Sequence, residues 1–469
     1  MRADAVEYAV TCIKHSGTGS FHCVRFSKGR ADAVEASFDG ELGICDIVGL
    51  DGGRVATTGA KADPVALVEK AEEIASLSTE RRAYASGISG IDSVISAMWP
   101  KMLDASRMLL KKLVLGAPMV IRFHNDADGT SGAYALYKSI EDFMANGNRL
   151  KGSYTAAWIM NRGITYTTAD ASHDLSSTGA FTSVEKPLLV IIDFGTSPGS
   201  NAGARLVGGK FDIIWIDHHP IEEGFVGQHL PFYINPWQYM GNSDIPAGFL
   251  VSAFSKTLSG IDTREIENAS FIGDYSPYAD KGAPGADLSA LLDMVTSDVR
   301  IVSGPSARNI TPRELDAIIT DKDMYAELLS FAKTRMSDMV ASAMSKIKKY
   351  KAGACTIYVS DFDDLRGEDT KYPLPGRFSS KLLEELMRIS GEHAVLLLNF
   401  GPYASIRVDT YLAGKAGILD IIAELKEKYA EEIESGGGHN TAANIKMAQG
   451  YQKEDVLRDL IALLKARLK

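Results

Sequence analysis

The chain has 469 residues, of which 45% are hydrophobic and 23% are charged. This balance is that of a globular protein, and at about 100 to 200 residues per domain the length predicts two to four domains. A formal net charge of −10 argues against a surface coated with basic side chains for duplex DNA, although a local basic groove is compatible with it. We find neither a run of the roughly 18 apolar residues that a membrane helix needs nor a signal-peptide pattern. We therefore expect a cytoplasmic protein without a membrane partner.

The N-terminal region alternates short β-forming runs with glycine and aspartate turns, up to about residue 75. The following stretch, DPVALVEKAEEIASLSTERRAYASG, has the apolar spacing of a helix. We expect a small β-rich module over residues 1–85, and its function stays open.

Cysteine usage predicts reduced thiols, because four cysteines are too few for a disulfide scaffold in a chain of this length. Cys12, Cys23 and Cys45 lie near His15 and His22 in the N-terminal module, which invites a zinc interpretation. The spacing is not that of paired zinc knuckles, however, and buried free cysteines are common. Buried thiols are therefore the favoured interpretation.

From about residue 98 the pattern becomes strand, turn and helix in repetition. APMVIRF is an apolar run followed by His124, and EKPLLVIIDFG and KFDIIWIDHHP contain two more apolar runs, each ending in an aspartate. Continuous apolar strands that alternate with helices predict a parallel sheet buried on both faces. Ligands of such sheets bind at the carboxyl ends of the strands, so the polar residues at those ends are candidates for a functional site. We assign residues 86–330 to this second domain.

The C-terminal part begins with a helix-rich stretch, whose last segment, YAELLSFAKTRMSDMVASAMSKIKKYKAG, is predicted to be one connecting helix. A mixed α/β unit follows from ACTIYVSDF onward. We expect a helical linker over residues 331–351 and a smaller α/β domain over residues 352–469. The lysines near the end of the linker could line a channel for a single strand or form a solvated helix end; they are Lys346, Lys348, Lys349 and Lys351.

Histidines and aspartates follow the predicted strands in a definite order. They are His124, Asp126, Asp128, Asp193, Asp217, His218, His219 and Asp274. So many carboxylates on one rim would repel one another unless a cation lay between them. Histidine and carboxylate ligands without cysteine suit Mn²⁺, with Mg²⁺, Zn²⁺ and Co²⁺ as competitors. A set of this size with one shared carboxylate suits two ions about 3.5–4 Å apart, the arrangement that drives displacement at phosphorus.

Each part of this pattern also has a structural interpretation. The aspartates of HNDADG are typical of a helix N-cap, and Asp193 can start an Asx turn. A histidine pair at a strand end is commonly a hydrogen-bonded structural pair. The combination of these residues at the ends of strands in one predicted sheet favours the metal interpretation.

HNDADG, VIIDFG, DHHP and IGD resemble the four motifs of the DHH phosphoesterase superfamily, and ESGGGHNTAANIKM resembles the Gly-Gly-Gly-His signature of the DHH-associated domain. The resemblance covers about residues 98–469. TSGA after the first motif and INPW after the third are similar to the RecJ-like exonucleases, especially archaeal ones. The resemblance implies a catalytic DHH domain over residues 86–330 and a substrate-binding DHH-associated domain over residues 352–469.

The resemblance also implies a role for each matching position. One ion would be bound by His124, Asp126 and Asp193. The other would be bound by Asp128, Asp193, His218 and Asp274, so that Asp193 bridges the two ions. Asp217 and His219 would orient the ligands or contact the scissile phosphate. The nucleophile would be a hydroxide on the two divalent ions, for which Mn²⁺ is favoured over Mg²⁺ or Co²⁺.

Substrate binding is implied for the second domain. Gly436, Gly437 and Gly438 would bring backbone amides close to a phosphate, and His439 and Arg407 would donate to its oxygens. The alternatives are a flexible glycine loop and a solvated strand arginine. Four aromatic residues follow the third and fourth motifs and could either stack on bases or pack in the core; they are Trp237, Tyr239, Tyr275 and Tyr278.

These features predict a metal-dependent phosphodiesterase, in first place a RecJ-like exonuclease on single-stranded DNA or RNA that serves repair or replication. A second hypothesis keeps the chemistry but changes the substrate to short oligonucleotides, cyclic dinucleotides, pyrophosphate or polyphosphate. A third is a replication scaffold that binds GINS. Because the chain retains every expected metal ligand, a purely structural scaffold is disfavoured.

Overall fold

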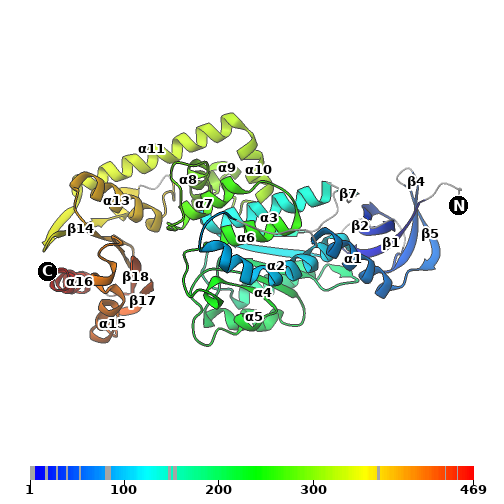
Figure 1. Ribbon diagram of the computed structural model, residues 1–469, viewed down its shortest axis with the longest axis horizontal. Helices are drawn as coiled ribbons and strands as arrows, with labels where there is room; N and C mark the ends of the chain where they lie inside the picture. The colour runs from blue at the N-terminus through cyan, green and yellow to red at the C-terminus, as the bar shows by residue number, and fades with distance from the viewer. Residues whose placement is uncertain are drawn as a thin grey trace. The chain divides into compact units, whose positions relative to one another are not determined.

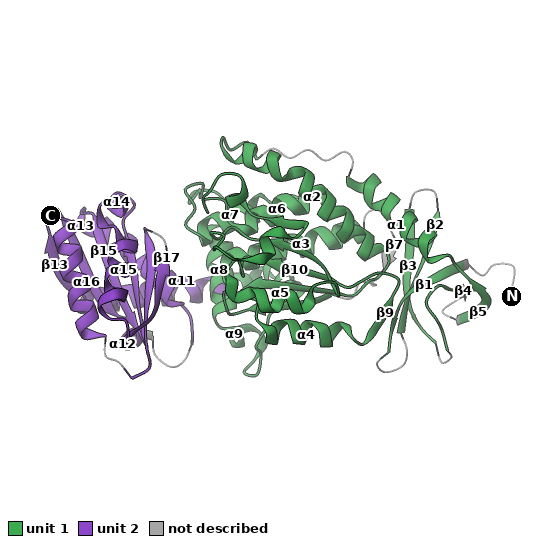
Figure 2. Ribbon diagram, turned by 90° about the horizontal axis from the view of Figure 1, so that it is seen from below, with its two compact units in different colours: residues 1–325 green, residues 326–469 purple. Residues whose placement is uncertain are grey.

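The computed structural model describes residues 6–15, 20–27, 30–38, 41–51, 54–79, 86–145, 149–151, 156–366, 370–438, 440–450 and 453–469 (Figure 1). The chain divides into two compact units, residues 1–325 and residues 326–469 (Figure 2). Both units combine helices with strands, so the predicted α/β fold class is confirmed. Among the described helices, none has both the length and the apolar composition that crossing a bilayer requires.

The N-terminal sheet of the first unit is mostly antiparallel, in the order β5-β4-β1-β2-β3-β7, with β9 also paired to β1. Its strands are β1 (Val6–Lys14), β2 (Ser20–Ser27), β3 (Arg30–Ser37), β4 (Asp46–Asp51), β5 (Arg54–Lys61), β7 (Arg149–Lys151) and β9 (Phe181–Ser183). The first five are the β-rich run that the sequence predicts. β7 and β9 come from later in the chain, so this sheet is hydrogen-bonded to the rest of the unit.

The cysteines of this sheet are buried free thiols. The thiol of Cys23 donates to the Val34 carbonyl at 3.5 Å, and Nε2 of His22 lies 3.1 Å from the Val114 carbonyl oxygen. Within the described ranges, no cysteine belongs to a group of side chains placed to bind a metal. The zinc interpretation is therefore not supported, and burial raises the pKa of both Cys12 and Cys23 to about 12.

We expect the free energy of unfolding to fall as the pH rises above about 8.5, the pKa of an unfolded cysteine. Between that pH and about 12, the unfolded chain releases thiol protons that native Cys12 and Cys23 retain. Each thiol then costs about 1.4 kcal/mol of stability per pH unit. Urea unfolding at pH 8.0 and 9.5 measures this effect. The Cys12→Ala/Cys23→Ala variant should show a smaller loss between these pH values, and an unchanged loss would contradict the prediction.

The central sheet of the first unit is parallel throughout, in the order β12-β11-β10-β6-β8. Its strands are β6 (Met119–His124), β8 (Ala156–Asn161), β10 (Leu188–Ile192), β11 (Asp212–Ile216) and β12 (Phe232–Ile234). Helices α3 (Ala127–Ala145) and α6 (Ala247–Leu258) cover one face, and α4 (Thr168–Thr178) and α5 (Asn201–Val207) cover the other (Figure 1). The predicted parallel sheet, buried on both faces, is confirmed.

The other helices of the first unit flank this sheet or connect its strands. They are α1 (Pro64–Thr79), α2 (Ile91–Val114), α7 (Arg264–Gly273), α8 (Ala286–Ser297), α9 (Arg300–Ser303) and α10 (Pro312–Thr320). Short 3₁₀ turns lie at η1 (Pro198–Ser200), η2 (Val226–His229) and η3 (Pro236–Gln238). Helix α7 packs against both α3 and α6, so its C-terminus reaches the carboxyl edge of the sheet.

The second unit is a sheet in the order β13-β14-β15-β16-β18-β17, with only β14 and β15 parallel among its described neighbours. Its strands are β13 (Lys348–Ala352), β14 (Cys355–Asp361), β15 (Ala394–Phe400), β16 (Tyr403–Val408), β17 (Ile433–Gly438) and β18 (Ala442–Met447). Its helices are α11 (Lys322–Lys346), which begins four residues before the boundary of the unit, α12 (Asp363–Arg366), α13 (Pro375–Ser390), α14 (Ala413–Ala416), α15 (Ile418–Lys428) and α16 (Glu454–Arg467). Helices α11 and α13 pack on one face, and α15 and α16 on the other.

The linker helix expected over residues 331–351 ends earlier than its sequence predicts. Helix α11 stops at Lys346, and Lys348, Lys349 and Lys351 lie in the edge strand β13 instead of at a helix end. β13 pairs with β14 along its whole length, which a local pattern does not reveal. Lysines suit an exposed edge strand because their charge opposes pairing with another chain.

Candidate metal centre

The candidate site lies at the carboxyl ends of three neighbouring parallel strands. β6 ends in His124, Asp193 follows β10 directly, and Asp217 to His219 follow β11. β10 lies between β6 and β11 in the sheet. Asp193 therefore has the residues of the first motif on one side and those of the third motif on the other.

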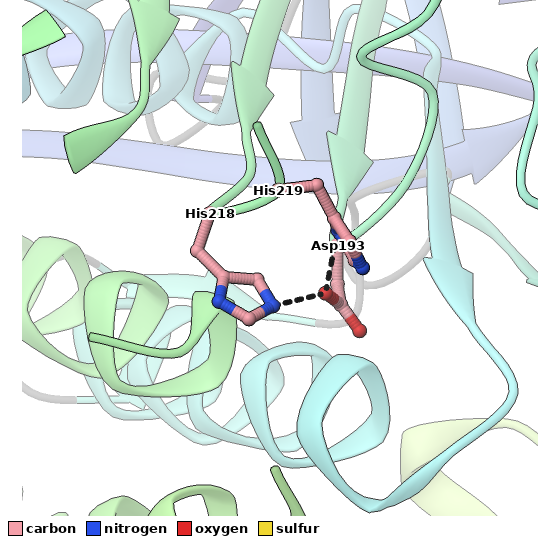
Figure 3. Close-up of side chains that lie close together, drawn as sticks. All are labelled: Asp193, His218 and His219. Carbon is pink, nitrogen blue, oxygen red and sulfur yellow. Dashed lines mark ion pairs between the residues drawn. The ribbon is translucent and has the colours of Figure 1, made fainter. Parts of the chain in front are cut away.

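Asp193 is the residue that both sides share. Its Oδ1 lies 3.4 Å from Nε2 of His218 and 3.8 Å from Nδ1 of His219 (Figure 3), and its Oδ2 lies 3.5 Å from Nδ1 of His124. The side chain is only 2% exposed, and neither oxygen has a hydrogen-bond partner in the described part of the chain. Burying a carboxylate without hydrogen bonds to its oxygens costs free energy. A cation at this position would remove that cost.

The described residues contain two groups of side chains placed to hold a metal ion; within each group the ligand atoms lie within 4.8 Å of one another, and both groups include Asp193. One set is His124, Asp126 and Asp193, and the other is Asp193, His218 and His219. The first set contains the same residues that the resemblance implies for one ion. The second brings in His219, which we had expected to orient ligands or contact phosphate. Nitrogen and carboxylate oxygen donors in this arrangement fit divalent transition ions.

The backbone at Asp193 is left-handed, with φ of +67°. Aspartate tolerates this region better than most residues, but the conformation is still costly. It is held by the tertiary structure: the Asp193 amide donates to the Ile216 carbonyl at 2.9 Å, and the Trp215 indole donates to the Phe194 carbonyl at 2.8 Å. Strained backbone of this kind concentrates at functional sites.

The first motif is held by contacts between β6 and the start of α3. Nδ1 of His124 lies 2.7 Å from Oδ2 of Asp126, and Oδ1 of Asp126 accepts the Gly129 amide at 3.0 Å. A Cβ at Gly129 would lie 2.7 Å from the His124 carbonyl oxygen, so only glycine lets the helix begin this close to the strand. The site therefore depends on a close approach of two backbone segments.

Asp128 is buried and largely engaged with the protein. Its carboxylate accepts the amides of Ala247 and Gly248, each at 2.8 Å, and the hydroxyl of Ser270. A Cβ at Gly248 would lie 2.6 Å from the Asp128 carbonyl oxygen, which explains the glycine. Oδ2 of Asp128 lies 3.7 Å from Nε2 of His218. Asp128 thus connects α3 to α6 and borders the cluster, and its role as a ligand stays a prediction.

The sequence pattern led us to expect Asp274 at a strand end, but it lies at the end of a helix. It caps the C-terminus of α7, where its amide donates to the Ser270 carbonyl at 3.0 Å. Its Oδ2 lies 3.7 Å from Nδ1 of His218. The difference arises because a helix, α7, packs against α3 and delivers this carboxylate to the rim.

Asp217 organises the DHH turn. Its Oδ1 accepts the amides of His218 at 2.7 Å and His219 at 3.1 Å, and it lies 2.8 Å from Nδ1 of His219. The side chain is fully buried. These contacts hold the His219 imidazole in one orientation, with Nε2 left for another partner, and they suit the orienting role that the resemblance implies.

The neighbouring charges and the burial of the cluster shift the pKa values of its histidines and aspartates. Burial lowers the pKa of His124 and His218, but neighbouring carboxylates, first Asp126 and Asp274 respectively, raise it well above the usual range. Burial and the nearby Asp193 raise the pKa of Asp128 well above that of a free carboxyl, and burial raises that of Asp274 to about 6. The metal-free site thus retains protons, which a bound cation would displace.

Supporting residues that sequence patterns did not identify surround His218. The Ser243 hydroxyl donates to the His218 carbonyl at 2.6 Å, and the Ser243 carbonyl oxygen lies 3.1 Å from its Nδ1. The Trp237 indole N–H lies 3.1 Å from the same His218 carbonyl and 2.9 Å from Ser243 Oγ. Trp237, which we considered for base stacking, therefore supports the loop that carries His218. Single serines in loops carry no sequence signal for this role.

A buried ion-pair network lies beside the cluster on β6. Arg122 is 3% exposed and donates to both carboxylate oxygens of Asp174, at 2.7–3.0 Å, and at 3.0 Å to Asn161 and Asp170. The Tyr166 hydroxyl donates to Asp174 at 2.9 Å. The network joins β6, the end of β8 and α4, two residues before His124. A lone arginine in an apolar strand did not predict it.

The predicted substrate-binding residues of the second unit lie on neighbouring strands. Gly436, Gly437 and Gly438 form the end of β17, so the described glycines lie in a strand and not in a loop. Arg407 on β16 and Gly438 on β17 flank the start of β18, because they pair with Ala442 and Ala443. Arg407 is half-buried, and its Nε donates to Ser380 at 3.2 Å. His439 lies outside the described residues.

Comparisons with known proteins address the fold. No protein-family model matches the sequence. An uncharacterized protein of Methanocaldococcus jannaschii is 22% identical over an alignment of 424 residues that covers 79% of this chain. The chain spans about half, 54%, of the length of that curated relative.

Among solved structures, a DHH domain from a protein described as a member of a family of ribosomal proteins matches with a TM-score of 0.69 at 20% identity. The match covers 86% of this chain and 98% of that one. RecJ of Thermus thermophilus, solved with Mn²⁺, matches with a TM-score of 0.45 at 13% identity over 86% of this chain and 59% of its own. The first match supports the architecture that the four motifs and the glycine signature imply.

Proposed function

We propose that this chain, which has the fold of a DHH domain, is a metal-dependent phosphodiesterase that acts as a RecJ-like exonuclease on single-stranded DNA or RNA. The observation that carries the proposal is Asp193, a buried carboxylate whose oxygens accept no hydrogen bond from the described residues and lie 3.4–3.8 Å from three histidines, between two groups of histidine and carboxylate donors. A paired site of this kind suits two ions, with Mn²⁺ favoured over Mg²⁺ and Co²⁺.

Two divalent ions bound at this cluster would polarise the phosphoryl oxygen and activate water. His124 and Asp126 would hold one ion, and His218, Asp128 and Asp274 the other, with Asp193 between them. Asp217 would keep the His219 imidazole oriented through its 2.8 Å contact with Nδ1. His219 is 43% exposed, so its Nε2 is free to donate to a phosphate oxygen of the substrate.

The second unit would contribute substrate binding. Gly437 and Gly438 are exposed at the end of β17, and a Cβ at Gly437 would meet nothing within 4 Å, so its backbone is open to a ligand. We propose that these amides, with Gly436, Arg407 and His439, bind phosphates of the strand. The division into a catalytic domain over residues 86–330 and a substrate-binding domain over residues 352–469 belongs to the same proposal.

The test is a gel assay with 5′-labelled and 3′-labelled single-stranded DNA and RNA and a dinucleotide, in Mn²⁺ and in Mg²⁺. We expect stepwise degradation of the long strands, and its loss in Asp126→Ala, because Asp126 contacts both His124 and the start of α3. Hydrolysis of the dinucleotide alone would assign the protein to short substrates. No metal-dependent activity on any of these would contradict the proposal and favour a scaffold that binds a replication partner such as GINS.

A further inference from the structure

The second unit carries three exposed side chains in contact at the start of β15 and the end of β16. They are His393, Tyr411 and Lys415, which we call the Tyr411 cluster. The rings of His393 and Tyr411 stack at a centroid distance of 4.2 Å and an angle of 13°, and Nζ of Lys415 lies 4.7 Å from the Tyr411 ring centroid. Tyr411 is 60% exposed and the His393 side chain is 49% exposed, so the stack lies at the surface of the unit.

A buried carboxylate, that of Asp409, holds the two rings in place. Its Oδ2 is hydrogen-bonded to Nδ1 of His393, and its Oδ1 accepts the Tyr411 amide at 3.3 Å. The turn that follows is fixed in the core of the unit, because Leu412 and Ala416 are buried and the Ala416 amide donates to the Leu412 carbonyl at 2.8 Å. The cluster is therefore preorganised, although its side chains are exposed.

The positive charge of the cluster has no partner of opposite sign. Neither Nζ of Lys415 nor the Tyr411 hydroxyl has a hydrogen-bond or ion-pair partner within the described residues. The acidic residue beside His393 is Glu392, whose carboxylate is bound by Lys351 at 2.6 Å. A free ammonium group and a hydroxyl next to an aromatic stack are the groups that bind phosphates of a single strand.

The Tyr411 cluster lies at the same end of the sheet as the glycines Gly436 to Gly438. The Val408 amide, at the end of β16, donates to the Thr441 carbonyl at 2.8 Å, just before β18 begins. β17 ends at Gly438, which pairs with Ala443 at the start of β18. Because one strand, β18, separates β16 from β17, the cluster and the glycines are about 10 Å apart. Stacked nucleotides at about 3.4 Å each span that distance in about three steps.

We propose that the Tyr411 cluster binds a second phosphate of a single-stranded nucleic acid, about three nucleotides along the strand from the phosphate at the glycines. Lys415 supplies the charge, the Tyr411 hydroxyl donates to a phosphate oxygen, and His393 positions the tyrosine ring. The inference rests on the proposed function and adds a length preference to it. Strands of about four or more nucleotides reach both contacts, whereas a dinucleotide reaches one.

The test measures the binding of a dinucleotide and of a strand of about ten nucleotides to the full chain by fluorescence anisotropy, with Ca²⁺ in place of Mn²⁺. Lys415→Gln removes the charge from an exposed position. Each phosphate contact of a single strand contributes about 0.7 to the slope of log K against log salt. Between about 50 and about 200 mM salt, the long strand should therefore lose about 2.6-fold less affinity in the variant than in the wild type. The dinucleotide should lose the same affinity in both proteins.

The matched control is Lys428→Gln. Lys428 also lies over a tyrosine ring, that of Tyr429 at 5.3 Å, but it is paired with Asp459. This variant should bind both ligands as the wild type does. Tyr411→Phe, which keeps the ring, should weaken the long strand alone by about 2- to 10-fold, the contribution of one hydrogen bond. Thermal unfolding should be the same for all three variants and the wild type.

Two results would overturn the inference: a wild-type salt dependence of the long strand in Lys415→Gln, or an equal change for the long strand and the dinucleotide. Failure of the wild type to bind the long strand would also overturn it. The proposed function is tested separately by hydrolysis in Mn²⁺. Strand binding with the expected difference in salt dependence but without hydrolysis would support the inference while the proposed function fails. Hydrolysis with unchanged salt dependence in Lys415→Gln would leave the proposed function standing and overturn the inference.

Discussion

Replacing Asp193 with alanine should abolish hydrolysis, with a fall in kcat of about 10²- to 10³-fold or more, the range seen when one preorganised electrostatic group is removed. The reason is that Asp193 contributes an oxygen to both groups of candidate ligands, so one substitution weakens both ion sites. Nδ1 of His124 and Nε2 of His218 approach its carboxylate from opposite sides, at 3.5 and 3.4 Å. Steady-state assays in Mn²⁺ measure the loss of hydrolysis, and calorimetric titration with Mn²⁺ measures the loss of ion binding.

The stability of the Asp193→Ala variant provides a further check. In the wild type, Mn²⁺ at 100 times its Kd should add about 2.7 kcal/mol, and the variant should lack this gain. Asp262→Ala, which removes a surface pair with Arg264, is the control for loss of an aspartate. Near-normal activity and Mn²⁺ affinity in Asp193→Ala would contradict a two-ion site.

Replacing Arg122 with methionine should destabilise the first unit by about 3–5 kcal/mol, the cost of leaving a buried charge without its partner. Asp174 is fully buried, and Arg122 donates to both of its oxygens. After the substitution, the Tyr166 hydroxyl would still donate to Asp174, at 2.9 Å, but it carries no compensating charge. Urea unfolding followed by circular dichroism measures the loss.

A second variant identifies the cause of that loss. Arg122→Met combined with Asp174→Asn removes the unpaired charge while an amide oxygen still accepts the Tyr166 hydroxyl. We expect this double variant to regain part of the stability that Arg122→Met loses. If it is no more stable than the single variant, the stability comes from the packing of the arginine and not from the ion pair.

The positions of the metal-binding candidates followed from local pattern. Apolar runs of strand length predicted β6, β10 and β11, and a polar residue stands directly after each of them. Parallel strands direct their carboxyl ends to one edge of a sheet, so His124, Asp193 and His218 were expected at the same edge. That they lie side by side depends on β10 lying between β6 and β11, which local pattern does not give.

Other features depended on contacts that local pattern does not contain. β13 is a strand because it pairs with β14, although its sequence directly continues the run that predicts the linker helix. Asp274 reaches the rim on a helix because α7 packs against α3. Each arises from pairing or packing between separate elements, which hydrophobic periodicity within one element does not report.

The amino-acid sequence by itself determined the fold class, the parallel sheet and the residues of a candidate cation site, because strand periodicity and the chemistry of histidine and aspartate are local properties. Only the tertiary structure decided how those residues are used. Asp128 is held by amides 119 and 120 positions away, and Arg122 is paired with Asp174 52 positions away. The left-handed backbone of Asp193 and Tyr275 is imposed by hydrogen bonds to neighbouring segments and helix ends. Such constraints exist only once the chain has folded.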